Sequence, residues 1–231
     1  MNRKTILISP ADSNIYNFFE RHYNVISSEY LEDYISFERY HADLQALRIK
    51  DKLFVDSKCR NLCNKLMKLN IEHILCNNIG SSYPQNVALN AALTGNKLIC
   101  NIKALHPKVK EYCINSGINL INVKQGYACC STLVVSDNAI ITDDVSIAKA
   151  AKLNDIEVLK IDKDNIILDE KNIGFIGGGS AKIGDSVYFF GDINQHRNSE
   201  DIIKFITEHK LNIVNVSDRQ IVDIGGLVII N

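Results

Sequence analysis

The chain has 231 residues, of which 46% are hydrophobic, and its 26 basic and 27 acidic side chains give a formal net charge of −1. This length and apolar content suffice for one large domain or two small ones with a buried core. Because no basic block is present and the longest apolar runs have only about five or six residues, the sequence argues against binding to nucleic acid and against a membrane span. We therefore expect a globular protein.

Cysteine usage bears on the compartment. The chain has seven cysteines, an odd number, and it is too large to need disulfides for stability. The N-terminal segment also lacks the apolar region and cleavage site of a signal peptide. We expect a cytoplasmic protein with reduced thiols. Cys59 and Cys63 have helical spacing and no partner pair at ligand spacing, so the sequence predicts no metal and no cofactor.

Short apolar runs that end in a polar residue recur along the chain. Each predicts a buried strand followed by a helix, whose first turn the terminal Asp, Asn or Ser would cap. A second run, rich in β-branched residues, follows each predicted helix and indicates another strand. The first runs begin at Thr5, Lys52, Lys97, Ala139 and Val187, and the second at Tyr23, Ile71, Ile118, Ile156 and Leu211.

A further candidate strand precedes four of the first runs, and hairpin turns join the two. These turns are Lys50-Asp51, Gly95-Asn96, Asp137-Asn138 and Gly184-Asp185. A fifth leading segment begins at Asp223 and runs to the C-terminus, so we expect it to pair with the strand at Thr5. The leading segments recur about every 45 residues, as supersecondary repeats do. This predicts one α/β domain, residues 1–231, in which five ββαβ modules close into a ring; two unrelated α/β domains are the alternative.

Two motifs lead modules of this ring. One is His41-Ala42-Asp43, and the other is the segment Gln125–Thr132, which contains Cys129-Cys130-Ser131-Thr132 and lies two modules further on. The whole arrangement resembles the pentein fold, a five-bladed α/β propeller with pseudo-fivefold symmetry. The fold is shared by deiminases, dimethylarginine dimethylaminohydrolase, amidinotransferases and the non-catalytic translation initiation factor six. In the enzymes the cysteine strand is C-terminal, so this chain resembles a circularly permuted branch.

The resemblance implies roles for the two motifs. His41 matches the family's general acid/base and Cys130 its nucleophile. Asp43, two residues after His41 and so expected on the same face of a strand, would orient the imidazole or bind a cationic group. Cys129 is the alternative nucleophile, because neighbouring residues of a strand face opposite ways and only one thiol can face the ring axis.

The remaining candidates would bind substrate. Asp223, Asn86 and Asn90 lie on other leading segments, and Gly177 and Gly178 suit a close approach of backbone at the centre of the ring better than a phosphate-binding loop. His106 and His196 are expected at the surface.

The resemblance implies that the deiminases and related enzymes bind the positive group of their substrates with acidic residues. The candidate residues of this chain include fewer acids than that pattern implies, which suits a smaller or neutral ligand. We therefore expect a cysteine-dependent hydrolase or deiminase-like enzyme, or an amidinotransferase, acting on a small amidine- or amide-containing molecule. The alternative is a non-catalytic scaffold that binds a partner.

Overall fold

The computed structural model describes residues 3–164 and 166–231, and within them the strands form five separate three-stranded sheets. In every sheet the middle strand pairs antiparallel with one neighbour and parallel with the other. A helix lies in the chain between the two parallel strands, because a parallel pair needs a crossover connection. The predicted α/β repeat of ββαβ modules is confirmed.

Each module has a leading strand, a middle strand, a helix and a closing strand. In chain order the internal modules are β3 (Ala46–Ile49), β4 (Lys52–Asp56), α3 (Arg60–Lys68) and β5 (Ile74–Cys76); β6 (Ala92–Thr94), β7 (Lys97–Cys100), α4 (Pro107–Asn115) and β8 (Asn119–Asn122); β9 (Thr132–Ser136), β10 (Ala139–Thr142), α5 (Val145–Lys152) and β11 (Glu157–Lys160); and β12 (Ser180–Ile183), β13 (Ser186–Phe189), α6 (Ser199–Glu208) and β14 (Asn212–Asn215). Short helical turns are η1 (Ser36–Glu38), α2 (Ala42–Gln45) and η2 (Ile193–Gln195).

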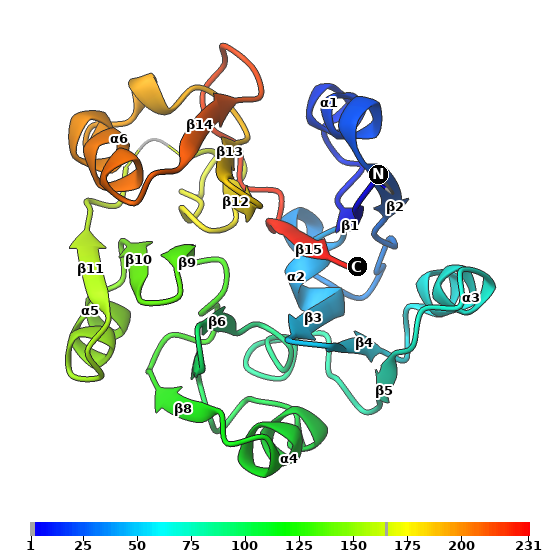
Figure 1. Ribbon diagram of the computed structural model, residues 1–231. Coiled ribbons are helices and arrows are strands. Elements are labelled where there is room, and N and C mark those ends of the chain that lie inside the picture. The colour runs from blue at the N-terminus through cyan, green and yellow to red at the C-terminus, as the bar shows by residue number, and fades with distance from the viewer. Residues whose placement is uncertain (1–2, 165) are drawn as a thin grey trace.

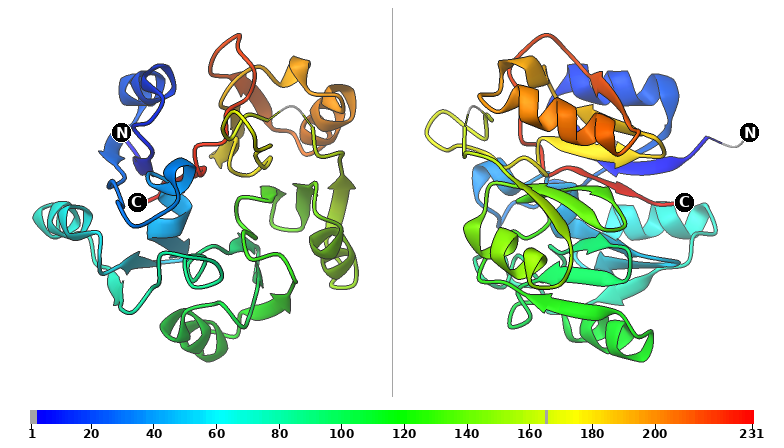
Figure 2. Two further views of the ribbon diagram at one scale, coloured as in Figure 1. Left: turned by 180° about the vertical axis from the view of Figure 1, so that it is seen from behind. Right: turned by 60° about the vertical axis from the view of Figure 1, so that its left-hand side comes forward.

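The two ends of the chain build the fifth module together. It consists of β15 (Leu227–Ile229), β1 (Thr5–Ile8), α1 (Ser13–His22) and β2 (Asn24–Ser27). Strand β15 pairs antiparallel with β1, with Leu7 opposite Val228, and the backbone N–H of Thr5 donates to Oδ1 of Asn231 at 2.9 Å. Figure 2 shows both termini on the same side of the molecule. The expected pairing of the C-terminal segment with the first strand is confirmed.

The modules are arranged around a common centre, with the leading strands innermost and helices α1, α3, α4, α5 and α6 on the outside (Figure 1). Leading strands of neighbouring modules contact one another: β6 contacts β9, β9 contacts β12, β12 contacts β15, and β15 contacts β3. Apolar side chains between the sheets and the outer helices form the core. None of the helices in the described residues has the length and apolar character of a membrane span.

The leading segments differ from the prediction at their first residues. Asp43 belongs to the helical turn α2 and His41 is the residue directly before it, so neither lies in a strand, and Cys129 and Cys130 lie in a turn before β9. Backbone segments crowd the centre of the molecule, where a Cβ on Gly177 would lie 2.3 Å from the carbonyl oxygen of Cys129. Both motifs reach this crowded centre as tight turns. Their side chains therefore do not alternate between two faces as they would in a strand, and the strand prediction for both motifs was wrong.

Helix capping also follows the prediction only in part. Asp144, which ends its strand run, caps α5 through a side-chain oxygen, as expected, whereas α1 is capped by Asp12, three residues beyond the serine that ends the first run. His106, predicted to lie at the surface, is buried: its Nδ1 accepts the N–H of Lys108 at the start of α4. His196 is buried as well, and its Nδ1 accepts a backbone N–H of the turn that leads into α6. Both surface assignments were wrong.

Candidate active site

Three chemically reactive side chains meet near the centre of the molecule. The Sγ of Cys130 donates a hydrogen bond to Oδ2 of Asp43 at 2.6 Å. One ligand-type atom from each of Cys130, Asp43 and His41 lies within 4.8 Å of the other two. All three residues are at least 95% buried, at 2%, 3% and 5% exposure respectively. The structure therefore brings together the three residues that the sequence predicted as a catalytic set.

Glycines allow the backbone to approach these side chains. Gly225 has φ +78°, and a Cβ at that position would lie 2.5 Å from Cβ of His41. Its carbonyl oxygen accepts the N–H of Asp43 at 3.3 Å, which fixes turn α2 against the segment before β15. On the other side, Gly178 donates its N–H to the carbonyl oxygen of Cys130 at 2.9 Å. The reactive side chains are thus positioned by segments from several modules.

A cavity of about 240 Å³ opens beside Cys130 and His41. We call it the loop-lined cavity, because its walls come mostly from segments between the regular elements. Two carboxylates line it, those of Glu38 and Asp223. The other lining residues are Phe37, Tyr127, Lys163, Leu168, Asn172, Ile173 and Phe175. Thiol, imidazole and carboxylates therefore face one small space.

Glu38 is the site residue that sequence reasoning missed. It is buried, accepts a hydrogen bond from the hydroxyl of Tyr127 at 2.7 Å, and accepts another from Nδ2 of Asn86 at 2.8 Å. The only signal was an acid three residues before His41. Its placement depends on turn η1 and on Tyr127, which comes from a segment 89 positions away.

The predicted substrate-binding residues divide into two groups. Asp223 lines the cavity, and its oxygens accept the N–H groups of Phe175 and Gly225, each at 2.9 Å. Gly178 makes room for this carboxylate, since a Cβ there would overlap Oδ1 of Asp223. Asn86 supports Glu38 and does not itself line the cavity.

Asn90 also lies outside the cavity lining and contacts the cysteine turn instead. Its Nδ2 donates to Sγ of Cys130 at 3.3 Å, and its Oδ1 accepts the N–H of Cys129 at 2.7 Å.

The adjacent thiols face different spaces. Cys129 lines a second cavity of about 390 Å³, the strand-lined cavity, whose walls are the leading strands together with Asp43 and Gly177. Cys130 lines the loop-lined cavity with His41.

Burial and nearby charge favour the protonated form of the Cys130 thiol. Burial raises its pKa well above the ordinary value, and the carboxylates of Asp43 and Asp223 raise it further. Burial also raises the pKa of Asp43 to about 6, although His41 and the hydrogen bond from Cys130 oppose this shift. Within the described residues, Nε2 of His41 and Oδ1 of Asp43 are buried without a hydrogen-bond partner. The imidazole therefore keeps a free nitrogen for a ligand.

The same three donors are chemically suited to a metal ion, but their spacing favours hydrogen bonding. A sulfur and an oxygen bound to one tetrahedral zinc ion lie about 3.5 Å apart. The 2.6 Å between Sγ of Cys130 and Oδ2 of Asp43 is a hydrogen-bond distance.

The fold is that of the pentein superfamily, as the sequence resemblance implied. Agmatine deiminase from C. jejuni is similar with a TM-score of 0.56 at 12% identity, over 94% of this chain and 87% of that chain. A cysteine-to-serine mutant of DDAH from Pseudomonas aeruginosa, complexed with citrulline, gives a TM-score of 0.57 at 7% identity, over 94% and 93%. Inosamine-phosphate amidinotransferase from Streptomyces griseus gives 0.58 at 8% identity, over 100% and 94%.

Within that fold the chain belongs to a family of unknown function, DUF6873, which matches residues 8–228. No curated protein matches the sequence.

Proposed function

We propose that the protein is a cysteine-dependent hydrolase of C–N bonds in a small amidine-containing molecule, with Cys130 as nucleophile and His41 as general acid/base. The observation that carries the proposal is the grouping of thiol, imidazole and carboxylate within 4.8 Å beside a cavity of about 240 Å³. This size suits a small molecule. The names of the structural neighbours, agmatine deiminase and DDAH, agree with that chemistry.

The proposed reaction has two steps. His41 accepts the thiol proton, the sulfur of Cys130 attacks the planar amidine carbon, and His41 returns the proton to the departing nitrogen as the C–N bond breaks. Water then attacks the carbon of the covalent intermediate while His41 takes its proton; as the S–C bond breaks, His41 returns this proton to the sulfur and the thiol is restored. The unpartnered Nε2 of His41 is the nitrogen available for these transfers.

The charges of the cavity favour a cationic substrate over a neutral amide. Glu38 and Asp223 line the space that the reacting group would enter. Their two carboxylates outnumber the one ammonium group among the described lining residues, that of Lys163, which lies 4.6 Å from the ring centroid of Phe175. Each carboxylate already accepts two hydrogen bonds. A carboxylate has about four acceptor positions, so both keep capacity for an amidinium group. The arriving cation would also offset the carboxylates that raise the pKa of Cys130, and so would favour the thiolate when substrate is bound.

We also infer a closed five-bladed propeller formed by one domain over residues 1–231, in a cytoplasmic protein. The pairing of β15 with β1 and the contacts between leading strands support closure. All seven cysteines are free, which agrees with a reducing compartment. A purely scaffolding role is not favoured, because it gives no reason for a free imidazole nitrogen beside a buried thiol.

The test is labelling with chloroacetamidine at neutral pH, followed by intact-mass measurement and peptide mapping. We expect one adduct on the parent, no adduct at this site in Cys130→Ala, and normal labelling in the matched control Cys129→Ala. A parent protein that does not react, or equal labelling of Cys130→Ala, would overturn the proposal.

A further inference from the structure

The side-chain amide of Asn90 makes an unusual set of contacts. Asn90 is 98% buried, at 2% exposure, and its own backbone N–H donates to the carbonyl oxygen of Val87, which fixes the turn before β6. Its Oδ1 accepts the N–H of Cys129 at 2.7 Å and that of Cys130 at 3.4 Å, while its Nδ2 donates to Sγ of Cys130 at 3.3 Å.

These partners determine the orientation of the amide. Backbone N–H groups can only donate, so the oxygen of Asn90 must face Cys129 and Cys130. The NH₂ group is then directed to an acceptor, the sulfur of Cys130. If the amide were rotated by 180°, its NH₂ group would face the backbone N–H groups of Cys129 and Cys130, and hydrogen-bond donors would face donors.

This donor counteracts the charges around the sulfur. Two carboxylates, those of Asp43 and Asp223, disfavour a negative sulfur. A hydrogen bond donated to a thiolate is stronger than one donated to a thiol, because the acceptor is charged. By holding both the turn and the sulfur, the amide also keeps Sγ directed toward Asp43 and the loop-lined cavity.

We propose that Asn90 is a positioning residue that aims the sulfur of Cys130 and stabilises its thiolate form. This role differs from the substrate contact predicted from the sequence, and it rests on the proposed function only in taking Cys130 as the nucleophile.

The first test measures how alkylation of Cys130 by iodoacetamide depends on pH, with the rate read from the mass of the Cys130 peptide. Because a hydrogen bond to a charged sulfur is stronger than one to a neutral thiol, Asn90→Ala and Asn90→Leu should slow alkylation at mildly alkaline pH by about tenfold or more and move the midpoint upward. The matched control is Asn101→Ala, which removes an amide of the same module that donates to the carbonyl oxygen of Lys124. Its rate should stay within about twofold of the parent.

A second measurement needs no variant at Asn90. In the ¹⁵N-labelled full chain, the side-chain NH₂ resonances of Asn90 should shift with pH at the midpoint of Cys130 ionisation, and this shift should disappear in Cys130→Ala. This role would be overturned if the alkylation rate were unchanged in both Asn90 variants, or if the pH-dependent shift of the NH₂ resonances were the same in the parent and in Cys130→Ala. Neither outcome would affect the labelling of Cys130 by chloroacetamidine. Failure of that labelling would count against the proposed function alone.

Discussion

Asp43 has a carboxyl group with two unequal oxygens. Oδ2 accepts the thiol hydrogen bond of Cys130, whereas Oδ1 is buried and without a hydrogen-bond partner among the described residues. Burial of such a group is costly mainly when it is charged. The protein therefore carries a destabilising charge at its reactive centre whenever Asp43 is ionised.

This charge gives a pH-dependent prediction for Asp43→Asn. The pKa of Asp43 is raised from 3.8 to about 6, so between these values the folded state binds a proton that the unfolded state has lost. Stability from this group is present below about pH 4 and falls as pH rises toward 6. Asparagine mimics the neutral acid, so the variant should be more stable than the parent by about 3 kcal/mol near pH 8 and equal to it near pH 4.

Urea unfolding of parent and variant at both pH values measures this difference. Asp143, whose pKa is also raised to about 6, titrates in both proteins and cancels in the comparison. An equal difference at the two pH values would contradict the assignment.

Glu38 gives a prediction about charge selectivity. Because its carboxylate lines the cavity with Cys130, it should attract a cationic reagent and not a neutral one. In Glu38→Gln, the reaction of Cys130 with chloroacetamidine should slow by about tenfold, while its reaction with neutral chloroacetamide should change by less than about twofold. Glu72→Gln, at an exposed position, is the control. Equal slowing of both reagents would show that Glu38 acts only through packing.

The site illustrates which residues a sequence can reveal. His41, Asp43, Cys130 and Asp223 could be predicted because they lead modules of a regular repeat, and the motifs around His41 and Cys130 also resemble those of the pentein enzymes. Glu38 was missed because it belongs to turn η1, outside that repeat, and its position depends on Tyr127 and Asn86 from distant segments. No local pattern encodes such contacts. The orientation of the Asn90 side chain could not be predicted either. It depends on the turn at Cys129 and Cys130, where the sequence predicts a strand.

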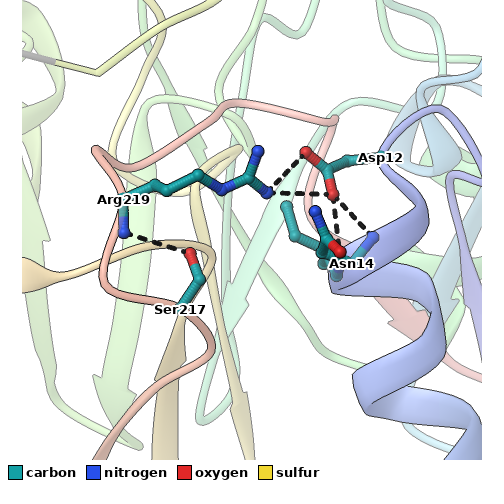
Figure 3. Close-up of polar contacts among 5 residues, drawn as sticks. Asp12, Asn14, Ser217 and Arg219 are labelled. Carbon is teal, nitrogen blue, oxygen red and sulfur yellow. Dashed lines mark hydrogen bonds and ion pairs between the residues drawn. The ribbon is translucent and has the colours of Figure 1, made fainter.

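At the scale of elements, helix α1 is held at its first turn by one residue with two roles. Oδ1 of Asp12 accepts the N–H groups of Asn14 at 2.9 Å and Ile15 at 3.1 Å, and Oδ2 forms an ion pair with Arg219 at 3.1 Å (Figure 3). Arg219 precedes β15, so the pair links the helix to the segment that enters the same module from the C-terminal side. The side chain of Arg219 is 52% exposed.

The two roles should differ in strength. Loss of an N-cap costs about 1 kcal/mol, whereas an exposed ion pair contributes a few tenths up to about 1 kcal/mol. We expect Asp12→Ala to lower the free energy of unfolding by about 1–2 kcal/mol, and Arg219→Ala by less than about half of that. Urea unfolding at low and high salt tests this, since only the ion-pair contribution should weaken with salt. An equal loss in both variants would contradict the capping role.

Helix starts also differ in how local their determinants are. The cap at Asp144 was predictable because this residue both ends a strand run and lies next to its own helix, whereas Asp12 lies beyond the end of the first run. Helix α3 was expected to be capped from the end of the preceding strand. Instead Glu29, which follows β2 of another module, accepts the N–H of Leu62 in its first turn at 2.6 Å. A cap supplied from a neighbouring module leaves no trace in the local sequence.

For the whole molecule, the chain ends interrupt one module where its hairpin would be. The break between β15 and β1 is equivalent to the hairpin turns that join leading and middle strands elsewhere. A permutant opened between Asp137 and Asn138, with the present ends joined by a short glycine linker, should therefore fold. Its melting temperature should lie within a few degrees of that of the parent, which corresponds to a change of roughly 1 kcal/mol in the free energy of unfolding.

A second permutant, opened inside α5 between Ala148 and Lys149, serves as the contrast. Its break removes helical hydrogen bonds and separates buried residues, so it should unfold at a much lower temperature. Circular dichroism melts of both compare them directly. Equal melting of the two permutants would show that the hairpin positions are not special.

The pairing of β15 with β1 also sets the order in which a nascent chain can mature. Ile6, Leu7 and Ile8 are fully buried in the finished protein, yet their antiparallel partner strand β15 lies roughly 220 residues later in the chain. Until β15 has been synthesised, one side of β1 is an unpaired apolar edge, and such edges are templates for aggregation and for chaperone binding. The edge of β1 is thus protected only after the four internal modules have been made, when β15 pairs with it.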